Sequence, residues 1–569
     1  MPKKQFGIEV IRHSLSHILA MAVLEVFPEA KLGIGPAIDN GFYYDFDLPR
    51  TLIPEDLPIL EEKMRKIINF DAKFEKEEIS SNKAIEKLKD QNYKIELIND
   101  LGDENISIYS IGNFIDLCKG PHVKSTADLK IISWKLDKIA GAYWKGSEKN
   151  KMLQRIYGLA FETKDDIKKY DDIIQEAEKR DHRKIGAELD LFSFHEEGPG
   201  FPFWHPKGMI IWNTLLNWWH DEHTNAGYQE IKTPIILTRE LWEKSGHWDH
   251  YKNQMYFTKI DERDFAIKPM NCPGSILYYK EKLHSYKEFP LRVAEVGLVH
   301  RHELAGVLHG LMRIRSFHQD DAHIYCLPEQ IENEVINVID LIDKMYCRLG
   351  LKYHLELSTR PDKGSIGSDE MWEKSELVLK TVLEKRKVNY KLNEGDGAFY
   401  GPKIDFHIED ALGRTWQTAT IQLDFAMPER FDLKYIDSHG NEQQLVMIHR
   451  VIFGAVERFI GILIEHFAGA FPVWLAPIQV IVLPIADRHI NYVKDRINEF
   501  KKNNIRVEID ERAESVNRKI RDAEKQKIPY ILIFGDKEIK SKKIAVRKYG
   551  KGDVGQSDIS EIIKEISQE

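Results

Sequence analysis

The residues with the most varied chemistry lie between Arg292 and Cys326, a stretch that predicts two strands joined by a loop rich in Gly, Leu and His. Strand side chains alternate between two faces. One face of the second strand is therefore predicted to carry two cations, an aromatic ring, an amide, a carboxylate and an imidazole: Arg313, Arg315, Phe317, Gln319, Asp321 and His323. Burying such a row costs free energy unless its groups have partners, so the row suits a ligand site. An exposed hairpin with salt bridges explains this stretch equally well.

A second group of reactive side chains comes from two distant segments. His13 and His17 are four residues apart in a segment of helical periodicity, residues 8–27, and are predicted to share a helix face. Cys118 and His122 have the same spacing in DLCKGPHV, where a Gly-Pro pair predicts a loop. These four side chains could form a tetrahedral zinc site or a hydrolytic site with imidazole as base. A histidine pair alone is usually an ordinary helix face, but the added loop motif favours a functional site. The absence of HExxH argues against a zinc protease.

The chain that carries these groups has 569 residues, which predicts several domains. Its net charge is -9, so a polyanionic partner would need local basic patches. Four cysteines are too few for a disulfide framework and indicate a reducing cytosol. The basic N-terminus does not resemble a signal peptide, and no apolar run is long enough to span a bilayer.

Several elements are predicted to position the reactive residues. We expect a charged helical region from Pro54 to Leu88, a charged helical connector over 162–190 and a Trp-rich helix from Met209 to His223. Cys272 is expected at the start of a helix, and another helix is expected at roughly Pro328 to Leu349.

The last third of the chain changes character. A strand over 416–425 should carry Thr418, Thr420, Gln422 and Asp424 on one face, and residues 446–467 predict an apolar helix entered through His449. From residue 477, short apolar strands alternate with charged helices, which predicts a small α/β domain with a largely parallel sheet. Its end is rich in Lys and Arg and suits contact with a phosphate backbone, although such runs are often solvated surface.

Ten motifs together give the chain a family resemblance: RHSLSH, GPAIDNGFYYDF, DLCKGPHV, GAYWKG, RDHRKIG, IKPMNCPG, HRHELAG, RSFHQDDAHI, GAFYGPKI and MIHR. With these motifs the chain resembles the threonyl-tRNA synthetases, a family of class II aminoacyl-tRNA synthetases, over essentially its whole length. The resemblance implies an α+β multidomain protein. Its parts would be an editing domain (1–163), a helical linker (164–186), a class II antiparallel-sheet catalytic domain (187–472) and an α/β anticodon-binding domain (473–569).

The resemblance also implies an ATP-dependent attachment of L-threonine to its tRNA. Arg301 would hold the α-phosphate and the threonine carboxylate, Glu303 the adenine amino group, and Phe317 would stack on adenine. The other catalytic or substrate-binding residues would be Arg313, Lys403, Arg458, Met270, Gln319, Asp321, Tyr400, Gln417, Thr420 and Gln422.

The cofactors implied by the resemblance are one catalytic Zn²⁺ per subunit and Mg²⁺ with ATP. Cys272, His323 and His449 match the family's zinc ligands, and three protein ligands with one open position is the pattern of a catalytic zinc. The open position would take the amino group and hydroxyl of threonine. Valine would be rejected because it has no hydroxyl.

Serine keeps the hydroxyl and lacks one methyl, a difference worth roughly 1–3 kcal/mol, which is too small for accurate translation. The resemblance therefore implies hydrolytic editing of misacylated Ser-tRNA in the N-terminal domain, by water and without an obligatory metal. The editing residues would be His13, His17, Cys118 and His122, with Tyr44, Lys94 and Asp116 as neighbours.

The expected partners are tRNA(Thr), ATP, L-threonine and a second copy in a homodimer, with Pro234 at the dimer interface, in the cytoplasm and away from membranes. Glu538 and Arg547 are candidate anticodon contacts. Three departures stand out: the chain starts at the editing helix without the usual ubiquitin-like domain, the third motif around Gly454 is poor in glycine, and Ala513 replaces a common Asn. The competing hypotheses are a non-catalytic synthetase-like tRNA-binding or regulatory protein, and a free metallohydrolase.

Overall fold

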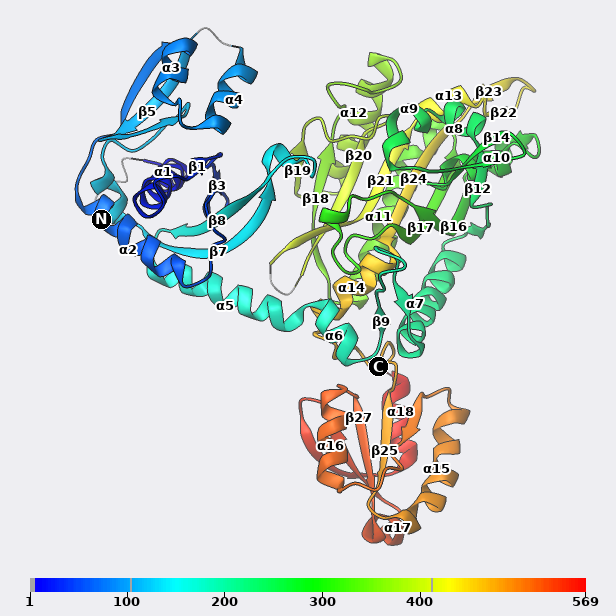
Figure 1. The fold of residues 1–569 in the computed structure, drawn as a ribbon. Coiled ribbons are helices and arrows are strands. Elements are labelled where there is room, and N and C mark those ends of the chain that lie inside the picture. The colour runs from blue at the N-terminus through cyan, green and yellow to red at the C-terminus, as the bar shows by residue number, and fades with distance from the viewer. Residues whose placement is uncertain (1–5, 103–104, 411–412, 569) are drawn as a thin grey trace. The chain divides into compact units, whose positions relative to one another are not determined.

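The computed structural model describes residues 6–102, 105–410 and 413–568 (Figure 1). The chain divides into two compact units, with the boundary between Gln175 and Glu176. Within the described residues, no helix combines the length and the apolar character needed to cross a membrane.

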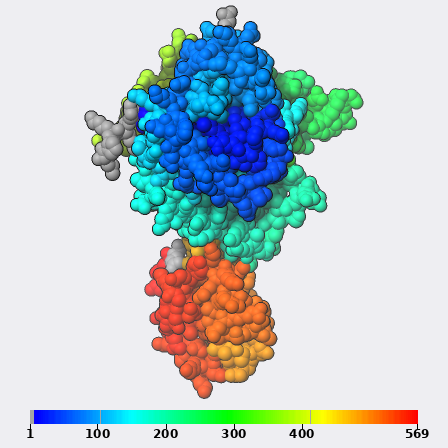
Figure 2. Space-filling model, turned by 60° about the vertical axis from the view of Figure 1, so that its left-hand side comes forward, coloured from blue at the N-terminus to red at the C-terminus, as the bar shows by residue number. Residues whose placement is uncertain are grey.

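The first unit is built around helix α1 (Ile8–Val26), close to the predicted range. Its apolar face, which includes Leu15 and Leu19, joins a core shared with the neighbouring sheet. That sheet has the order β1 (Lys31–Leu32), β3 (Gly41–Asp47), β8 (Met152–Phe161) and β7 (Ser133–Tyr143), with β2 (Ala37–Ile38) also paired to β3. In Figure 2 the dark-blue surface of the start of the chain is bordered by lighter blue from later parts of this unit.

A smaller antiparallel sheet completes the first unit, in the order β4 (Glu75–Ser80), β5 (Asn105–Ile111) and β6 (Phe114–Leu117). The prediction of continuous helical structure from Pro54 to Leu88 was wrong, because β4 separates α2 (Asp56–Asn69) from α3 (Ser81–Lys87). The segment EKEEIS has helix-forming Glu and Lys side chains, but pairing with β5 overrides that propensity. The remaining helix is α4 (Asn92–Leu101).

The second unit is dominated by an eight-stranded sheet. Its order is β11 (Gln229–Glu230), β16 (Leu291–His300), β17 (Ser316–Cys326), β24 (Val446–Ala455), β21 (Thr415–Asp424), β20 (Lys403–Glu409), β18 (Lys352–Ser358) and β19 (Tyr390–Asn393). The six central strands pair antiparallel, and only the two edge strands pair parallel to their neighbours.

Helices bury the apolar face of this sheet. The main ones are α7 (Pro206–Asn225), α11 (Ile331–Arg348), α12 (Asp369–Lys385) and α14 (Val456–His466). The predicted Trp-rich helix corresponds to α7, and the helix expected near 328–349 corresponds to α11 after a short 3-10 turn. The charged connector forms α5 (Lys164–Arg180) and α6 (His182–Glu188).

The segment 446–467 was predicted as one helix, and this was wrong. Residues 446–455 form strand β24, and the helix α14 begins only at Val456. A strand buried on both faces is apolar at successive positions, so periodicity alone does not separate it from a buried helix. Gly454, with φ +74°, lies at the irregular end of the strand. The correction matters because it puts His449 in the centre of the sheet.

The hairpin predicted between Arg292 and Cys326 is present, but its strands are shorter than expected. β16 ends at His300, so Arg301 and Glu303 follow the strand, and Arg313 and Arg315 precede β17 in the loop. The predicted face alternation therefore applies only from Phe317 to the end of β17.

The C-terminal part of the second unit has a five-stranded sheet in the order β26 (Val507–Ile509), β25 (Val480–Pro484), β27 (Tyr530–Phe534), β28 (Ile544–Lys548) and β29 (Gly552–Ser557). Its helices are α15 (Ile490–Lys502), α16 (Val516–Lys525), α17 (Asp536–Ser541) and α18 (Ile559–Gln568). The expected largely parallel sheet is mixed, because β27, β28 and β29 pair antiparallel. Strands β28 and β29 are joined by a three-residue turn, which is too short for a parallel crossover.

The remaining elements of the second unit are β9 (Phe192–Ser193), β10 (Phe203–Trp204), β12 (Ile236–Thr238), β13 (Tyr256–Ile260), β14 (Arg263–Ile267), β15 (His284–Ser285), β22 (Lys434–Ile436), β23 (Glu442–Gln444), α8 (Arg239–Ser245), α9 (His247–Tyr251), α10 (Cys272–Tyr279) and α13 (Ala426–Arg430).

Candidate functional site

Two adjoining cavities of about 350 and 210 Å³ lie over strands β17, β21 and β24 of the second unit. They are neighbours, because both are lined by Arg301, Gln319, Thr420 and Val451. The first, called the amino-acid cavity after the ligand that the resemblance implies, is also lined by Met270, Cys272, Asp321, Tyr400, Lys403, Gln422 and His449. The second, called the nucleotide cavity for the same reason, is also lined by Glu303, Arg313, Phe317, Gln417 and Arg458. The structure thus brings together the residues that the resemblance assigned to catalysis and substrate binding.

Three candidate metal ligands, Cys272, His323 and His449, meet beside the amino-acid cavity, which Cys272 and His449 line. His323 of β17 is directly opposite His449 of β24 in the strand register, and Cys272 begins helix α10. All three side chains are buried, and their ligand atoms lie within 4.8 Å of one another. Within the described part of the chain, the Nε2 atom of His323 is buried without a hydrogen-bond partner. A buried thiol, two imidazoles and an unsatisfied nitrogen together fit a zinc ion.

A carboxylate behind the trio fixes the orientation of one imidazole. His449 Nε2 lies 2.8 Å from Asp424 Oδ2, and Asp424 Oδ1 accepts hydrogen bonds from the backbone N–H groups of Ala426 and Met427. The carboxylate holds the imidazole proton on Nε2, which leaves Nδ1 as the nitrogen free to bind a metal. Asp424 was predicted only as a member of a strand face, and its role needed the pairing of β21 with β24.

Asp321 is a carboxylate that also lines the amino-acid cavity. Burial raises the pKa of Asp321 to about 7. Asn271 Nδ2 donates to Asp321 Oδ2 over 3.3 Å, and His323 Nε2 lies 3.7 Å from the other carboxylate oxygen. A cationic group in the cavity would favour the ionised carboxylate.

The nucleotide cavity has a cationic wall and an aromatic plate. The guanidinium of Arg301 lies 5.3 Å from the centre of the Phe317 ring, and Arg313 pairs with Glu303 over 3.1 Å. The pKa of Arg458 is lowered by burial and by its proximity to Arg301 and Arg313. Three guanidinium groups that repel one another in a partly buried cavity are suited to a polyanion that carries aromatic surface.

Asp405 organises the polar side of both cavities and was not predicted. Lys403 Nζ lies 2.8 Å from Asp405 Oδ2, while Gln417 Nε2 and Thr420 Oγ1 donate to Oδ1 over 2.6 and 2.9 Å. The carboxylate is buried and lies on the same strand face as Lys403, two residues earlier. That period-two spacing was a signal in the sequence that could have identified it.

Asp320 was also missed, because it points to the other face of β17. Its carboxylate accepts hydrogen bonds from the backbone N–H groups of Ile452, Phe453 and Gly454 over 2.9–3.1 Å. These residues form the irregular stretch of β24 where its register with β17 shifts. Burial raises the pKa of Asp320 to about 6. No sequence spacing links residue 320 with residues 452–454.

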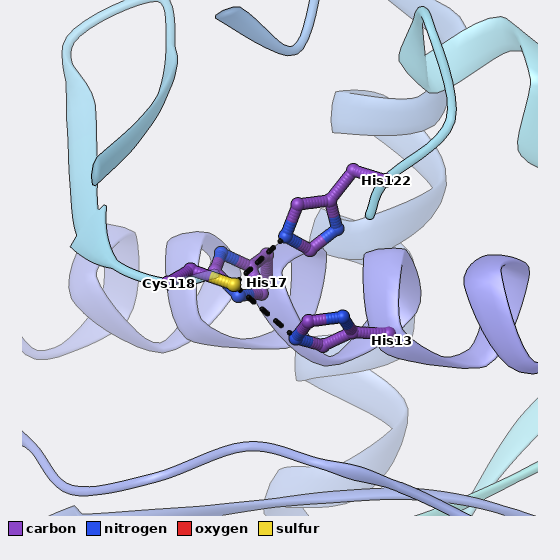
Figure 3. Close-up of side chains that lie close together, drawn as sticks. All are labelled: His13, His17, Cys118 and His122. Carbon is purple, nitrogen blue, oxygen red and sulfur yellow. Dashed lines mark hydrogen bonds between the residues drawn. The ribbon is translucent and has the colours of Figure 1, made fainter. Parts of the chain in front are cut away.

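In the first unit, the two predicted pairs form one cluster (Figure 3). His13 and His17 project from α1 toward Cys118 and His122 on the loop that follows β6. Cys118 Sγ lies 3.4 Å from His13 Nε2 and 3.2 Å from His122 Nε2. Ser14, which was not predicted, lies 3.1 Å from His122 Nδ1 through its Oγ.

The three expected neighbours of the cluster are also present. Asp116 is buried, and its carboxylate accepts from Tyr44 Oη over 2.5 Å and pairs with Lys94 Nζ over 2.5 Å. His17 Nδ1 lies 3.6 Å from the same carboxylate. The seven predicted editing residues therefore lie in one continuous network.

Burial decides the protonation states in this cluster. It lowers the pKa of His122 to about 2 and lowers the pKa of His13 and His17 below the ordinary value. It also raises the pKa of Cys118 to about 11. At neutral pH the imidazoles are uncharged and can accept protons, while the thiol keeps its proton and is a poor nucleophile. The four side chains also lie close enough together to hold a metal ion.

A cavity of about 550 Å³ opens beside Cys118. Its lining includes Lys76, Lys119, Ser107 and the apolar side chain of Leu97. It is large enough for a nucleoside-sized group, and its wall carries two cationic side chains, Lys76 and Lys119, and two carboxylates, Glu78 and Asp100.

The two predicted anticodon contacts lie in the C-terminal fold. Glu538 belongs to α17 and accepts from the backbone N–H of Gly535 over 3.0 Å. Arg547 belongs to β28 and pairs with Glu524 over 3.3 Å. Each of these side chains has a protein partner in the structure.

Comparison with known proteins matches three separate parts of the chain to three family models. Residues 106–157 match the family model of the threonyl and alanyl tRNA synthetase second additional domain. Residues 256–467 match the tRNA synthetase class II core domain (G, H, P, S and T), and residues 479–569 match the anticodon binding domain. Threonine–tRNA ligase of Carboxydothermus hydrogenoformans is 60% identical over 99% of this chain and 89% of its own length. The chain belongs to the threonine–tRNA ligase family.

Other members of this family give the same result. Threonine–tRNA ligase of Desulforamulus reducens is also 60% identical over 99% of this chain and 89% of its own length. Among solved structures, the RNA binding domain of threonyl-tRNA synthetase from Cryptosporidium parvum Iowa II has a TM-score of 0.66 and 40% identity, and it covers 68% of this chain and 98% of that one. The multidomain α+β prediction with a class II core is confirmed.

Proposed function

We propose that the chain attaches L-threonine to its tRNA at the adjoining cavities of the second unit and hydrolyses misacylated Ser-tRNA in the first unit. The observation that carries the proposal is that the two cavities adjoin and share four lining residues. An arginine-rich nucleotide cavity adjoins a cavity that is lined by two members of a buried Cys-His-His trio, Cys272 and His449. Such a site can hold ATP and a small amino acid with their reacting groups in contact. A non-catalytic tRNA-binding protein would have no use for this arrangement.

ATP occupies the nucleotide cavity in this proposal. Adenine stacks on Phe317, near the guanidinium of Arg301, and Glu303 accepts a hydrogen bond from the adenine amino group. Arg301, Arg313 and Arg458 hold the triphosphate together with Mg²⁺. These guanidinium groups stabilise the charge that develops when the threonine carboxylate attacks the α-phosphorus. The attack forms the carboxyl–phosphate bond and expels pyrophosphate.

Threonine occupies the amino-acid cavity, with Asp321 facing its ammonium group and Gln319, Tyr400 and Gln422 around its side chain. Cys272, His323 and His449 would hold one Zn²⁺, which supplies a Lewis-acidic position for the amino group and hydroxyl of threonine. Asp424 keeps His449 in the tautomer that this role requires. Because valine lacks the hydroxyl, discrimination against it can reach roughly 10⁴–10⁵.

The editing reaction is assigned to the cluster in Figure 3. The neutral imidazole of His13 takes a proton from water as the water oxygen bonds to the ester carbonyl carbon. The ester C–O bond breaks as the imidazolium returns this proton to the departing ribose oxygen of the tRNA. The protonated thiol of Cys118 serves as a hydrogen-bond partner, and the cavity beside it receives the terminal nucleoside of the tRNA.

The remaining assignments complete the proposal. The domain limits 1–163, 164–186, 187–472 and 473–569 separate editing, linker, catalytic and anticodon-binding parts. Glu538 and Arg547 contact anticodon bases, and two chains pair through the segment that contains Pro234. A cytoplasmic location follows from the substrates, since charged tRNA is used there.

The test is amino-acid-dependent exchange of pyrophosphate into ATP by zinc-loaded protein, with threonine, serine and valine compared. We expect exchange with threonine, weaker exchange with serine and none with valine. Cys272→Ala should lose bound zinc and threonine-dependent exchange, whereas Cys347→Ala, which removes an exposed thiol, should keep both. Absence of threonine-dependent exchange in the zinc-loaded wild-type protein would refute the proposed function.

A further inference from the structure

A buried histidine outside both cavities connects the linker to the nucleotide cavity. His182 begins helix α6 and is fully buried. Its Nε2 atom accepts a hydrogen bond from the backbone N–H of Leu311 over 3.0 Å. Its Nδ1 atom donates to Glu465 Oε1 over 2.7 Å. Both ring nitrogens are engaged, so the tautomer is defined: the proton lies on Nδ1.

Leu311, which contacts His182, belongs to the loop between β16 and β17. Leu311 and Met312 are buried and line the nucleotide cavity together with Arg301 and Phe317. The carbonyl oxygen of Met312 accepts from Arg458 Nε over 2.8 Å. A change at the Leu311 amide is therefore passed through one peptide unit to the arginine that lines the cavity.

Helix α14 holds this loop segment at two points. Arg458, near its first turn, contacts Met312, and Glu465, near its end, contacts His182, which in turn contacts Leu311. Residues seven apart lie on the same face of a helix. Glu465 is itself fixed by an ion pair with Arg414. The segment Leu311–Met312 is therefore held at two points along one face of α14, by Arg458 directly and by Glu465 through His182.

Gly310 shows how closely the loop approaches the ring. Its φ is +47°, and a Cβ atom at this position would meet His182 Nε2 at 2.1 Å. The ring of His309 also makes an edge contact with His182, with ring centres 5.8 Å apart. Although Asp181, His182 and Glu465 are close enough together to suggest a metal site, both nitrogens of His182 already have protein partners.

We propose that His182 is a positioning residue for ATP in the adenylation reaction. It holds Leu311 and Met312 in the wall of the nucleotide cavity and so keeps Arg458 aimed at the triphosphate. This inference rests on the proposed function, because it assumes that ATP occupies that cavity. It does not place His182 in contact with ATP.

Two substitutions separate the two nitrogens. In His182→Asn the side-chain amide can replace Nδ1 and donate to Glu465, but it does not reach Leu311. In His182→Gln the amide oxygen reaches the position of Nε2 and can accept from Leu311. We expect His182→Asn to raise the KM for ATP about tenfold in threonine-dependent pyrophosphate exchange, the effect of one lost hydrogen bond in a buried site. The KM for threonine should change less than about twofold. His182→Gln should restore the KM for ATP to within about threefold of wild type.

The matched control is His220→Asn. His220 pairs with Glu230 over 2.9 Å and lines neither cavity, so both KM values should stay at the wild-type level. Equal KM values for ATP in wild type and His182→Asn would overturn the inference. Equal rises in both KM values would also overturn it, because they would indicate general loosening.

If both His182 variants fail to fold, Gly310→Ala tests the same contact from the loop side. The added methyl group would overlap His182 Nε2, so the loop and the ring must move apart. The same ATP-selective rise in KM is expected, and a wild-type KM for ATP would overturn the inference. A wild-type protein without threonine-dependent exchange would instead refute the proposed function, before any variant is compared.

Discussion

The replacement Asp424→Asn tests whether the Cys-His-His trio is a zinc site. In the wild-type structure Asp424 Oδ2 faces His449 Nε2, and Oδ1 accepts two backbone N–H groups. Asparagine has nearly the same shape and can keep the two backbone contacts with its oxygen. Its NH₂ group then faces His449 Nε2. Because a donor now meets this nitrogen, the imidazole proton moves to Nδ1, the atom that would bind the metal.

The expected size of the effect follows from the buried position of this pair. Asp424 is fully buried and His449 is nearly so. A hydrogen bond to a charged group contributes about 1.5–3 kcal/mol, and each 1.4 kcal/mol changes a dissociation constant tenfold. We therefore expect zinc to bind about 10–100-fold more weakly in Asp424→Asn, which is the range found when the supporting partners of metal ligands are removed.

Zinc affinity is measured by competition with a chelator of known affinity, on folded protein checked by circular dichroism. The matched control is Glu457→Gln. Glu457 is also a buried carboxylate that pairs with a histidine, His318, over 2.9 Å, but His318 is not a proposed ligand. Its zinc affinity should equal that of the wild type. A zinc dissociation constant for Asp424→Asn within about threefold of the wild-type value would refute the reasoning, because the loss of one hydrogen bond should change it by more.

Two further predictions concern the first unit. Enzymatic hydrolysis of Ser-tRNA, after subtraction of the uncatalysed rate, should fall little as the pH is lowered from about 8 to 7. Burial holds the pKa of His13, His17 and His122 below the ordinary 6.5, so the imidazoles remain unprotonated bases over this range. A titration with a midpoint near the ordinary value would contradict these protonation states. Asp116→Ala should lower the free energy of unfolding of this unit by about 3–5 kcal/mol in urea, because it leaves the buried Lys94 ammonium without its carboxylate. The control variant Glu62→Ala removes one partner of an exposed ion pair, so its free energy of unfolding should equal that of the wild type. If Asp116→Ala is as stable as the wild type, the result would show that water reaches the Lys94 ammonium.

Several elements could be predicted from local patterns. The ranges of α1 and α7 and the position of Cys272 at the start of α10 followed from periodicity and from Pro and Gly signals. The alternation along β17 correctly put Phe317 and Gln319 on one face. The helical interpretation of 446–467 failed because a strand buried on both faces has no alternation to detect. The strand β4 was missed because its pairing partner lies more than twenty residues away.

The sequence by itself determined which chemical groups are available and, through the ten motifs, the family. The tertiary structure decided which groups meet. His449 faces His323 only because β24 inserts between β17 and β21, and Asp424 reaches His449 only through the neighbouring pairing. His182 reaches Leu311 over 129 residues of chain. Local spacing reports on neighbours within one helix or strand, whereas these contacts depend on strand order and long-range packing, which no local spacing encodes.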